Sequence, residues 1–339
     1  MKEKILNLPA LKAREDMLQE ILNEEYGLLP APPEKLDFSA EKLQNSNFCA
    51  GKALLFKITA HCTVKGKEFS FPFYYTELTS KGKHPFFIHI NFRDCVPDLY
   101  LPTEELVDNG FCVLSFCYKD VTSDTKDFQD GLAGVLYKNG ERADNDGGKI
   151  ALWAWAAQRV MDYAYTQKEK LDLERSVVCG HSRLGKTALL TAATDERFKF
   201  CYSNDSGCCG SAISRGKEGE TIRKIYEVFP FWFCKNFEKY KDNEDALPFD
   251  QHSLIACIAP RKVLIGSADE DLWADPKAEQ LSCFAASPAF SKGFDCPDRA
   301  AEVGEAFLKG DIGYHLRKGK HYFSREDWAR LIEFVNLHS

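Results

Sequence analysis

The sequence lacks several features that would each have pointed to a particular class of protein. No run of basic residues occurs, and 44 Lys and Arg against 51 Asp and Glu leave a net charge of -7. Nucleic-acid binding depends on clustered Lys and Arg that neutralise phosphates, so a nucleic-acid partner is not expected. No apolar run approaches the length that crosses a bilayer, so a membrane partner is not expected either.

The N-terminal stretch MKEKILNLPALKARED also lacks the apolar core and small-residue cleavage site of a secretory signal peptide. The 13 cysteines are odd in number, and the adjacent Cys208 and Cys209 lack the CxxC pairing of a zinc site. Most of the cysteines stand in apolar contexts, where a thiol packs as a small core residue. We therefore expect a reduced, cytoplasmic protein with no bound metal, or a secreted or periplasmic one if a leader was removed.

The order of apolar segments predicts an α/β protein. An amphipathic helix over residues 11–27 precedes a Pro-rich linker, and two runs rich in β-branched and aromatic residues, 53–64 and 67–78, predict antiparallel strands. Beyond them, strands alternate with helices, which indicates a mostly parallel sheet. The further strands are expected at 84–92, 111–118, 176–180, 198–205, 262–268 and 312–319, and the further helices at 150–167, after Ser182, at 278–290 and at 324–339.

The length of 339 residues, 44% of them hydrophobic, suits one large domain over residues 1–339. Residues 1–50 are interpreted as an N-terminal helical extension. Residues 206–247 lack clean periodicity and hold many aromatic side chains, so we interpret them as an insertion. Because ligands of doubly wound sheets bind at the carboxyl ends of the strands, this insertion is expected to form a lid or wall there.

The stretch CGHSRLGKTA, residues 179–188, can be interpreted in two ways. As GxxxxGK[ST], with Lys186 and Thr187 at its end, it would be a P-loop that holds a nucleotide phosphate. As a nucleophile elbow, it would place Ser182 on a sharp turn between a strand and a helix. The second interpretation departs from the usual GxSxG, because Leu184 stands two residues after the serine and the glycine follows at 185.

The rest of the chain favours the hydrolase interpretation. A P-loop usually lies near the start of its domain, and the domain also needs a second strand that ends in a metal-binding Asp. The strand at 262–268 does not end in such a residue. A hydrolase predicts a nucleophile, then an acid after a later strand, then a histidine before the last helix, as in Ser182, the acids at 269–271 and His321. An imidazole takes the serine proton and a carboxylate orients the imidazole. His315 is a rival histidine one strand earlier.

The motif GHSRLGK resembles the G-C/H-S-R-x-G-K signature of the carbohydrate esterase family 15 glucuronoyl esterases. Four further stretches match that family in the same order, namely SNDSGCCG, LPFDQHSLIACIAPR, DLWADP and GKHYFSREDW, and the resemblance covers roughly residues 80–339. It implies an α/β-hydrolase fold, with helices on both faces of a mostly parallel sheet and an N-terminal helix and antiparallel hairpin. It also implies hydrolysis of esters between 4-O-methyl-glucuronic acid of xylan and lignin-type alcohols, without a cofactor.

The resemblance also implies roles for individual residues. Ser182 matches the nucleophile, His321 the catalytic base, and Arg183 the arginine that helps to stabilise the oxyanion together with a backbone N–H. Two positions that hydrogen-bond the sugar hydroxyls match Lys186 and Glu220. The indole that packs at the uronate matches Trp273.

The acid of the triad has two candidates, since the family places it in either of two positions. Asp271 corresponds to an acid after the later strand. Asp205 corresponds to a Glu directly before the Ser-Gly that follows the strand after the elbow, and it is one methylene shorter. A shorter side chain reaches less far toward the imidazole, so we favour Asp271 and keep Asp205 as the second candidate.

Three alternatives stay open from the sequence. An acetylxylan or other carbohydrate carboxylesterase would use the same triad without needing Lys186, Glu220 and Trp273 for a uronate. A P-loop nucleotide-binding protein would need Mg²⁺, and a non-catalytic carbohydrate-binding protein would keep sugar binding without Ser182. The sequence leaves the oligomeric state open, and a cytoplasmic enzyme would process imported oligosaccharide esters rather than polymer.

Overall fold

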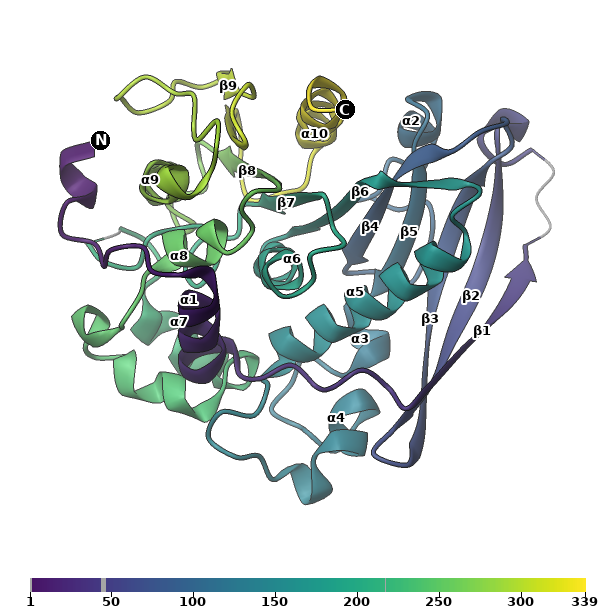
Figure 1. The fold of residues 1–339 in the computed structure, drawn as a ribbon, viewed down its shortest axis with the longest axis horizontal. Coiled ribbons are helices and arrows are strands. Elements are labelled where there is room, and N and C mark those ends of the chain that lie inside the picture. Colours follow the sequence, from purple (N-terminus) through teal and green to yellow (C-terminus); the bar gives the residue numbers. More distant parts are fainter. Residues whose placement is uncertain (1, 44–46, 217) are drawn as a thin grey trace.

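The computed structural model describes residues 2–43, 47–216 and 218–339, and these residues form one ten-stranded sheet (Figure 1). Strands β5, β4, β6, β7, β8 and β10 run parallel to one another, so the predicted mostly parallel sheet is confirmed. In sheet order the strands are β1 (Lys35–Lys42), β2 (Ala53–Val64), β3 (Lys67–Leu78), β5 (Cys112–Cys117), β4 (His84–Asn91), β6 (Leu171–His181), β7 (Phe200–Asn204), β8 (Lys262–Ala268), β10 (Ile312–Arg317) and β9 (Ala306–Phe307).

The antiparallel hairpin lies where the sequence predicts it, because β2 and β3 have the bounds of the two expected strands. Residues 1–50, interpreted from the sequence as an N-terminal helical extension, also contain β1, which pairs with β2 as a third antiparallel strand. Its sequence, KLDFSAEK, is mostly charged or polar and mostly exposed. Such an edge strand carries a weak apolar alternation, and its charges protect the open edge of the sheet.

Helices cover both faces of the sheet. Figure 1 shows α5 and α6 beneath it and α2 and α10 above it. The helices are α1 (Arg14–Ile21), α2 (Thr103–Asp108), α3 (Tyr118–Val121), α4 (Gly131–Leu136), α5 (Lys149–Thr166), α6 (Arg183–Thr194), α7 (Ile222–Val228), α8 (Gln251–Ala256), α9 (Pro276–Ala286) and α10 (Arg325–Leu337). Helix α5 is apolar nearly all round because it is buried between the sheet and neighbouring helices, and Trp153 and Trp155 are fully buried there.

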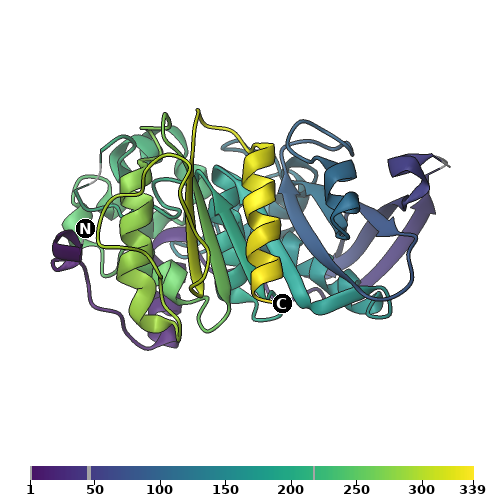
Figure 2. The same ribbon diagram turned by 90° about the horizontal axis from the view of Figure 1, so that it is seen from above.

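Helix α10 shows how local sequence positions the chain near the strand ends. Ser324 and Asp327 form a capping box, in which each side chain bonds the main-chain N–H of the other. The buried side chains Trp328, Leu331 and Val335 then form one apolar stripe. This stripe packs α10 along β7, β8 and β10 on one face (Figure 2), so the loop that enters α10 is held at the carboxyl edge of the sheet. Within the described ranges, no helix is both long and apolar enough to span a membrane.

Candidate active site

Ser182 lies in a strained turn between β6 and α6. Its backbone angles are φ 57° and ψ −126°, a conformation that residues other than glycine rarely adopt. Close packing forces the turn to be sharp: a Cβ at Gly180 would lie 2.2 Å from the Leu184 carbonyl oxygen, and one at Gly185 would lie 2.9 Å from the Ser203 hydroxyl. A strained serine between a strand and a helix has the geometry of a nucleophile elbow.

His321 and Asp271 meet because they follow neighbouring parallel strands. Arg317 at the end of β10 pairs in register with Ala268 at the end of β8, so the two following loops leave the sheet side by side. Nδ1 of His321 lies 2.6 Å from Oδ2 of Asp271. The Asp271 side chain is 5% exposed and the His321 side chain 44% exposed. A buried carboxylate that accepts from Nδ1 orients the imidazole and leaves Nε2 as the proton acceptor.

Asp205, the second candidate acid, directly follows β7 and makes different contacts. Its Oδ2 accepts from Nη2 of Arg317 at 3.1 Å and, more weakly, from the main-chain N–H of Tyr322 at 3.4 Å. Burial raises the pKa of Asp205 well above its usual range, and Arg317 offsets part of this rise. Both predicted acids therefore lie beside His321, but Asp271 is the one that accepts a hydrogen bond from its imidazole.

Among the described residues, Asp205, Asp271 and His321 form the group of possible metal ligands whose donor atoms lie within 4.8 Å of one another. Two of the donor atoms already have partners, since Nδ1 of His321 pairs with Asp271 and Oδ2 of Asp205 accepts from Arg317, whereas Oδ1 of Asp205 has no hydrogen-bond partner in the described part of the chain. The guanidinium of Arg317 would also repel a cation at this point. These donors fit proton transfer to and from His321 better than metal ligation.

Arg183, the residue after the serine, is held rigidly beside it. One of its terminal nitrogens, Nη1, pairs with the carboxylate of Asp124, and its guanidinium lies 4.7 Å from the ring centre of Trp232. Asp124 also accepts from Nε1 of Trp232 at 2.7 Å and from the hydroxyl of Tyr118 at 2.9 Å. Asp124 was not among the sequence predictions, because nothing in the local pattern of its loop marks it as a partner of Arg183.

One pocket of about 320 Å³ brings all the predicted site residues together, a volume suited to a small ligand. Phe229 and Trp232 complete its wall and stack on each other with ring centres 3.9 Å apart. Both residues belong to the segment 206–247. Its many aromatic side chains led to the prediction of an insertion that forms a lid or wall at the carboxyl ends of the strands. The predicted residues that line the pocket are Ser182, Arg183, Lys186, Asp205, Glu220, Asp271, Trp273 and His321.

The three predicted sugar-binding residues, Lys186, Glu220 and Trp273, all line this pocket. Nζ of Lys186, which is 3% exposed, donates to the carbonyl oxygen of Ser206. The main-chain N–H of Glu220 donates to the carbonyl oxygen of Trp273 at 3.0 Å, so these two segments lie side by side. Trp273 is 54% exposed, and Nζ of Lys224 lies 4.7 Å from the centre of its ring.

Two other histidines lie close to the site and are buried. The ring centre of His181 lies 4.4 Å from that of His321, and burial lowers the pKa of His181 well below its usual range. The rival candidate, His315, hydrogen-bonds the hydroxyl of Tyr202 at 3.0 Å, and burial lowers its pKa to about 4. Both imidazoles are therefore neutral near pH 7, and neither lines the pocket around Ser182.

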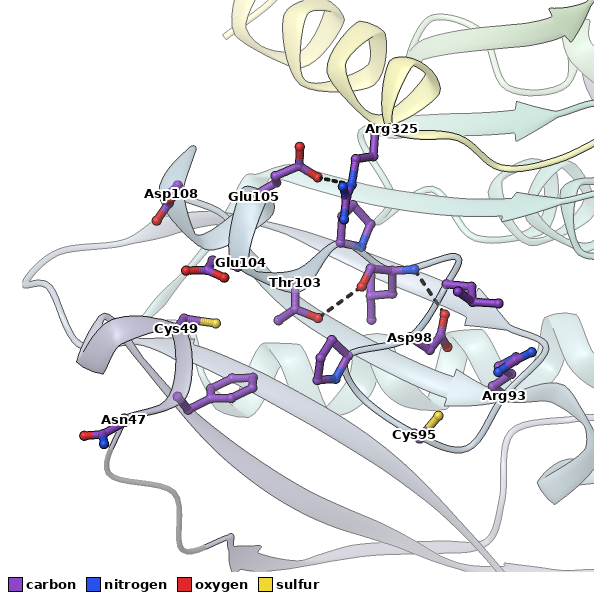
Figure 3. A pocket seen from close by; sticks show the side chains of 15 residues that line it. Asn47, Cys49, Arg93, Cys95, Asp98, Thr103, Glu104, Glu105, Asp108 and Arg325 are labelled. Carbon is purple, nitrogen blue, oxygen red and sulfur yellow. Dashed lines mark hydrogen bonds and ion pairs between the residues drawn. The ribbon is translucent and has the colours of Figure 1, made fainter. Parts of the chain in front are cut away.

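The structure also has a larger cavity of about 950 Å³ (Figure 3). It is bounded by the loop after β4, by α2 and by the start of α10. Figure 3 shows Arg325 turned toward Glu105, to which its Nε is bonded at 2.8 Å. Among the described residues, its lining holds carboxylates and arginines but no serine or histidine. The smaller pocket around Ser182 is therefore the candidate active site.

The parallel sheet, the elbow after β6 and the acid and histidine after β8 and β10 define an α/β-hydrolase fold. Two solved structures share it closely. A promiscuous esterase of carbohydrate esterase family 15 from a marine bacterial metagenome is 32% identical with a TM-score of 0.85, over 97% of this chain and 91% of that one. A glucuronoyl esterase from Solibacter usitatus is 29% identical with a TM-score of 0.87, over 96% and 92%.

The family described as "Glucuronyl esterase, fungi" matches residues 60–292. A carbohydrate esterase, MZ0003, from an unknown prokaryotic organism is 42% identical over 241 residues, which are 69% of this chain and 55% of that protein. The chain belongs to the glucuronoyl esterase family. It spans about half the length of the curated relatives that it matches.

Proposed function

We propose that this protein is a serine esterase that hydrolyses the ester between (4-O-methyl-)glucuronic acid of glucuronoxylan and a lignin-type alcohol. One observation carries the proposal: the pocket that holds the elbow serine and the Asp-supported histidine also holds Lys186, Glu220 and Trp273. The first set supports ester hydrolysis in general. The second set supports a uronate as the acyl group.

In the proposed reaction, Nε2 of His321 takes the proton of Ser182 while the serine oxygen attacks the ester carbonyl. The oxyanion of the tetrahedral intermediate interacts with Arg183 and a backbone N–H. His321 then protonates the departing alcohol, which leaves a uronoyl ester on Ser182. Water, deprotonated by His321, attacks this ester and releases the acid and the free serine.

We assign the acid of the triad to Asp271. The 2.6 Å contact between its Oδ2 and Nδ1 of His321 supports this role. Asp205 has a shorter side chain than the Glu found at this position in some family members, and Arg317 already occupies its Oδ2. In this chain Asp205 would therefore contribute to the order of the site rather than to proton transfer.

We assign recognition of the uronate to three groups. Lys186 has three N–H donors, of which one binds the Ser206 carbonyl, so two stay available for sugar hydroxyls. The carboxylate of Glu220 can accept from further hydroxyls, and the indole of Trp273 offers an apolar face to the sugar ring. The segment 206–247 supplies Glu220 together with the aromatic wall, in keeping with an insertion that covers the site in a single domain.

A second candidate function is hydrolysis of acetylxylan or other carbohydrate carboxylic esters. It is favoured by the likeness to a promiscuous member of carbohydrate esterase family 15. A P-loop function has no comparable support, because Nζ of Lys186 binds the carbonyl of Ser206. The catalytic machinery would be the same for both esters, so only the acyl group that is turned over separates the two candidates.

The test compares acid release from the benzyl ester of methyl glucuronate with acetate release from acetylated xylan, for the wild type and Ser182→Ala. We expect faster turnover of the uronate ester and its loss in the variant. Faster release of acetate would establish the second candidate. Sugar binding without turnover of either ester would contradict both and support a carbohydrate-binding protein.

We further propose that the enzyme works in a reducing, cytoplasmic environment on imported oligosaccharide esters. All 13 cysteines belong to the described part of the chain, and all are free thiols, most of them buried. Proteins of oxidising compartments more often pair their cysteines. Cell fractionation tests this proposal, and recovery of the enzyme in a secreted or periplasmic fraction would overturn it.

A further inference from the structure

Arg317 is a buried arginine at the carboxyl end of β10, only 3% exposed and outside the pocket lining. Its guanidinium is held from two sides by carboxylates. Nε donates to Oδ2 of Asp327 at 2.7 Å, and Nη2 donates to Oδ2 of Asp205 at 3.1 Å. These two acids come from α10 and from the residue directly after β7, so two other segments of the chain fix the position of a side chain on β10.

The same guanidinium also binds the main chain on both sides of His321. Nη2 donates to the carbonyl oxygen of Lys320 at 3.1 Å and to that of Tyr322, and Nη1 donates to that of Lys318 at 3.3 Å. The residues directly before and after the histidine are thus attached to one rigid, planar group. Arginine suits this task because its five N–H donors are fixed in one plane.

The loop has further anchors at its two ends: Nζ of Lys318 pairs with Asp269 and Glu270, and the hydroxyl of Tyr322 donates to the carbonyl oxygen of Leu99 at 3.0 Å. The side chains of Lys318 and His321 are 70% and 44% exposed, and Gly319 has a φ of 118° that allows a sharp turn. On the side away from Arg317, the N–H of Gly319 donates to Oδ1 of Asp269 at 2.7 Å. Asp269 thus holds the start of the loop, while Arg317 holds the two peptide groups that carry His321.

We propose that Arg317 is a positioning residue for catalysis: it holds the backbone on both sides of His321, so that the imidazole stays between Ser182 and Asp271. It touches neither the substrate nor the reacting atoms. This role rests on the proposed catalytic function of His321. The same role gives a function to Asp205, which stands at the position of the second candidate acid. Asp205 pairs with Arg317 there and helps to keep the guanidinium in place.

The test uses Arg317→Lys, which keeps a positive charge between the two acids but cannot reach all of the carbonyl oxygens at once. We expect kcat on the uronate ester to fall about 100-fold, the size of effect expected when a reacting group is displaced by about 1 Å. KM should stay nearly constant, since sugar contacts are unchanged. The rate at which a fluorophosphonate labels Ser182 should fall in parallel, because labelling needs His321 but no sugar.

The matched control is Arg261→Lys. Arg261 is a partly buried arginine that also donates to two main-chain carbonyls, those of Asp195 and Phe198 at 3.1 Å each, but at the opposite end of β8. It should lose stability without losing labelling rate per folded molecule. If Arg317→Lys does not fold, Asp327→Asn weakens the support of Arg317 more gently, and we expect an intermediate fall in labelling rate.

Equal labelling rates per folded molecule in Arg317→Lys and Arg261→Lys would overturn the proposal. So would a downfield Nδ1 proton resonance of His321 that is as sharp in Arg317→Lys as in the wild type. If wild-type Ser182 is labelled but the uronate ester is not hydrolysed, the proposed substrate fails. The role of Arg317 is then still decided by labelling and by the resonance.

Discussion

The assignment of the triad acid leads to a sharp prediction for Asp271→Asn. The substitution keeps the size of the side chain but replaces a carboxylate by an amide. At the 2.6 Å contact, the amide NH₂ would donate to Nδ1 of His321 and drive the imidazole to the tautomer that is protonated at Nε2. In that tautomer, Nε2 cannot take the proton of Ser182.

The size of the loss follows from the surroundings of this contact. The remaining nearby carboxylate, Asp205, has its Oδ2 bound to Arg317, and the structure shows no hydrogen bond between it and the imidazole of His321. We therefore expect the full effect of a wrong tautomer, about 10⁴-fold in kcat, which corresponds to about 5.5 kcal/mol of transition-state stabilisation. Asp205→Asn should lower kcat by no more than about tenfold, because Arg317 keeps its other acceptors.

The assay is kcat and KM on the benzyl uronate ester for both variants, with thermal unfolding to compare the folded fractions. The two single substitutions are matched controls for each other, since both remove one buried carboxylate beside His321. A larger loss in Asp205→Asn than in Asp271→Asn would refute the reasoning and assign the acid to Asp205. Equal and large losses would show that the two carboxylates act together.

Two further predictions concern residues that the sequence did not single out. Asp124→Asn removes the charge that holds Arg183. In steady-state kinetics it should lower kcat about 10-fold to 100-fold at nearly constant KM. An unchanged kcat would mean that Arg183 is positioned without Asp124. Burial raises the pKa of Glu25 from 4.5 to about 7, so the folded state holds this proton more tightly than the unfolded state. The resulting stabilisation is fully present below pH 4.5, declines between pH 4.5 and 7, and amounts to about 3 kcal/mol. Glu25→Gln should make thermal stability less dependent on pH in this window, and an unchanged slope would contradict the assignment.

Local sequence determined the elements whose residues interact mainly with their neighbours in the chain. The strands Ala53–Val64, Lys67–Leu78 and Lys262–Ala268 begin and end where the β-branched and apolar runs predict. The elbow was also predictable, because the glycines around Ser182 are close to it in sequence. Strand β1 was missed because it is held by pairing with β2 and has only a weak apolar alternation of its own.

The order of Ser182, an acid and His321 along the chain determined which residues meet, because the carboxyl ends of parallel strands share one edge of the sheet. The tertiary structure decided how they meet. Whether Asp205 or Asp271 bonds His321 depends on the length of one side chain and on Arg317, a competitor 112 residues from Asp205. Asp124 reaches Arg183 across 59 residues. Such contacts depend on the packing of distant segments, which leaves no periodic trace in the sequence.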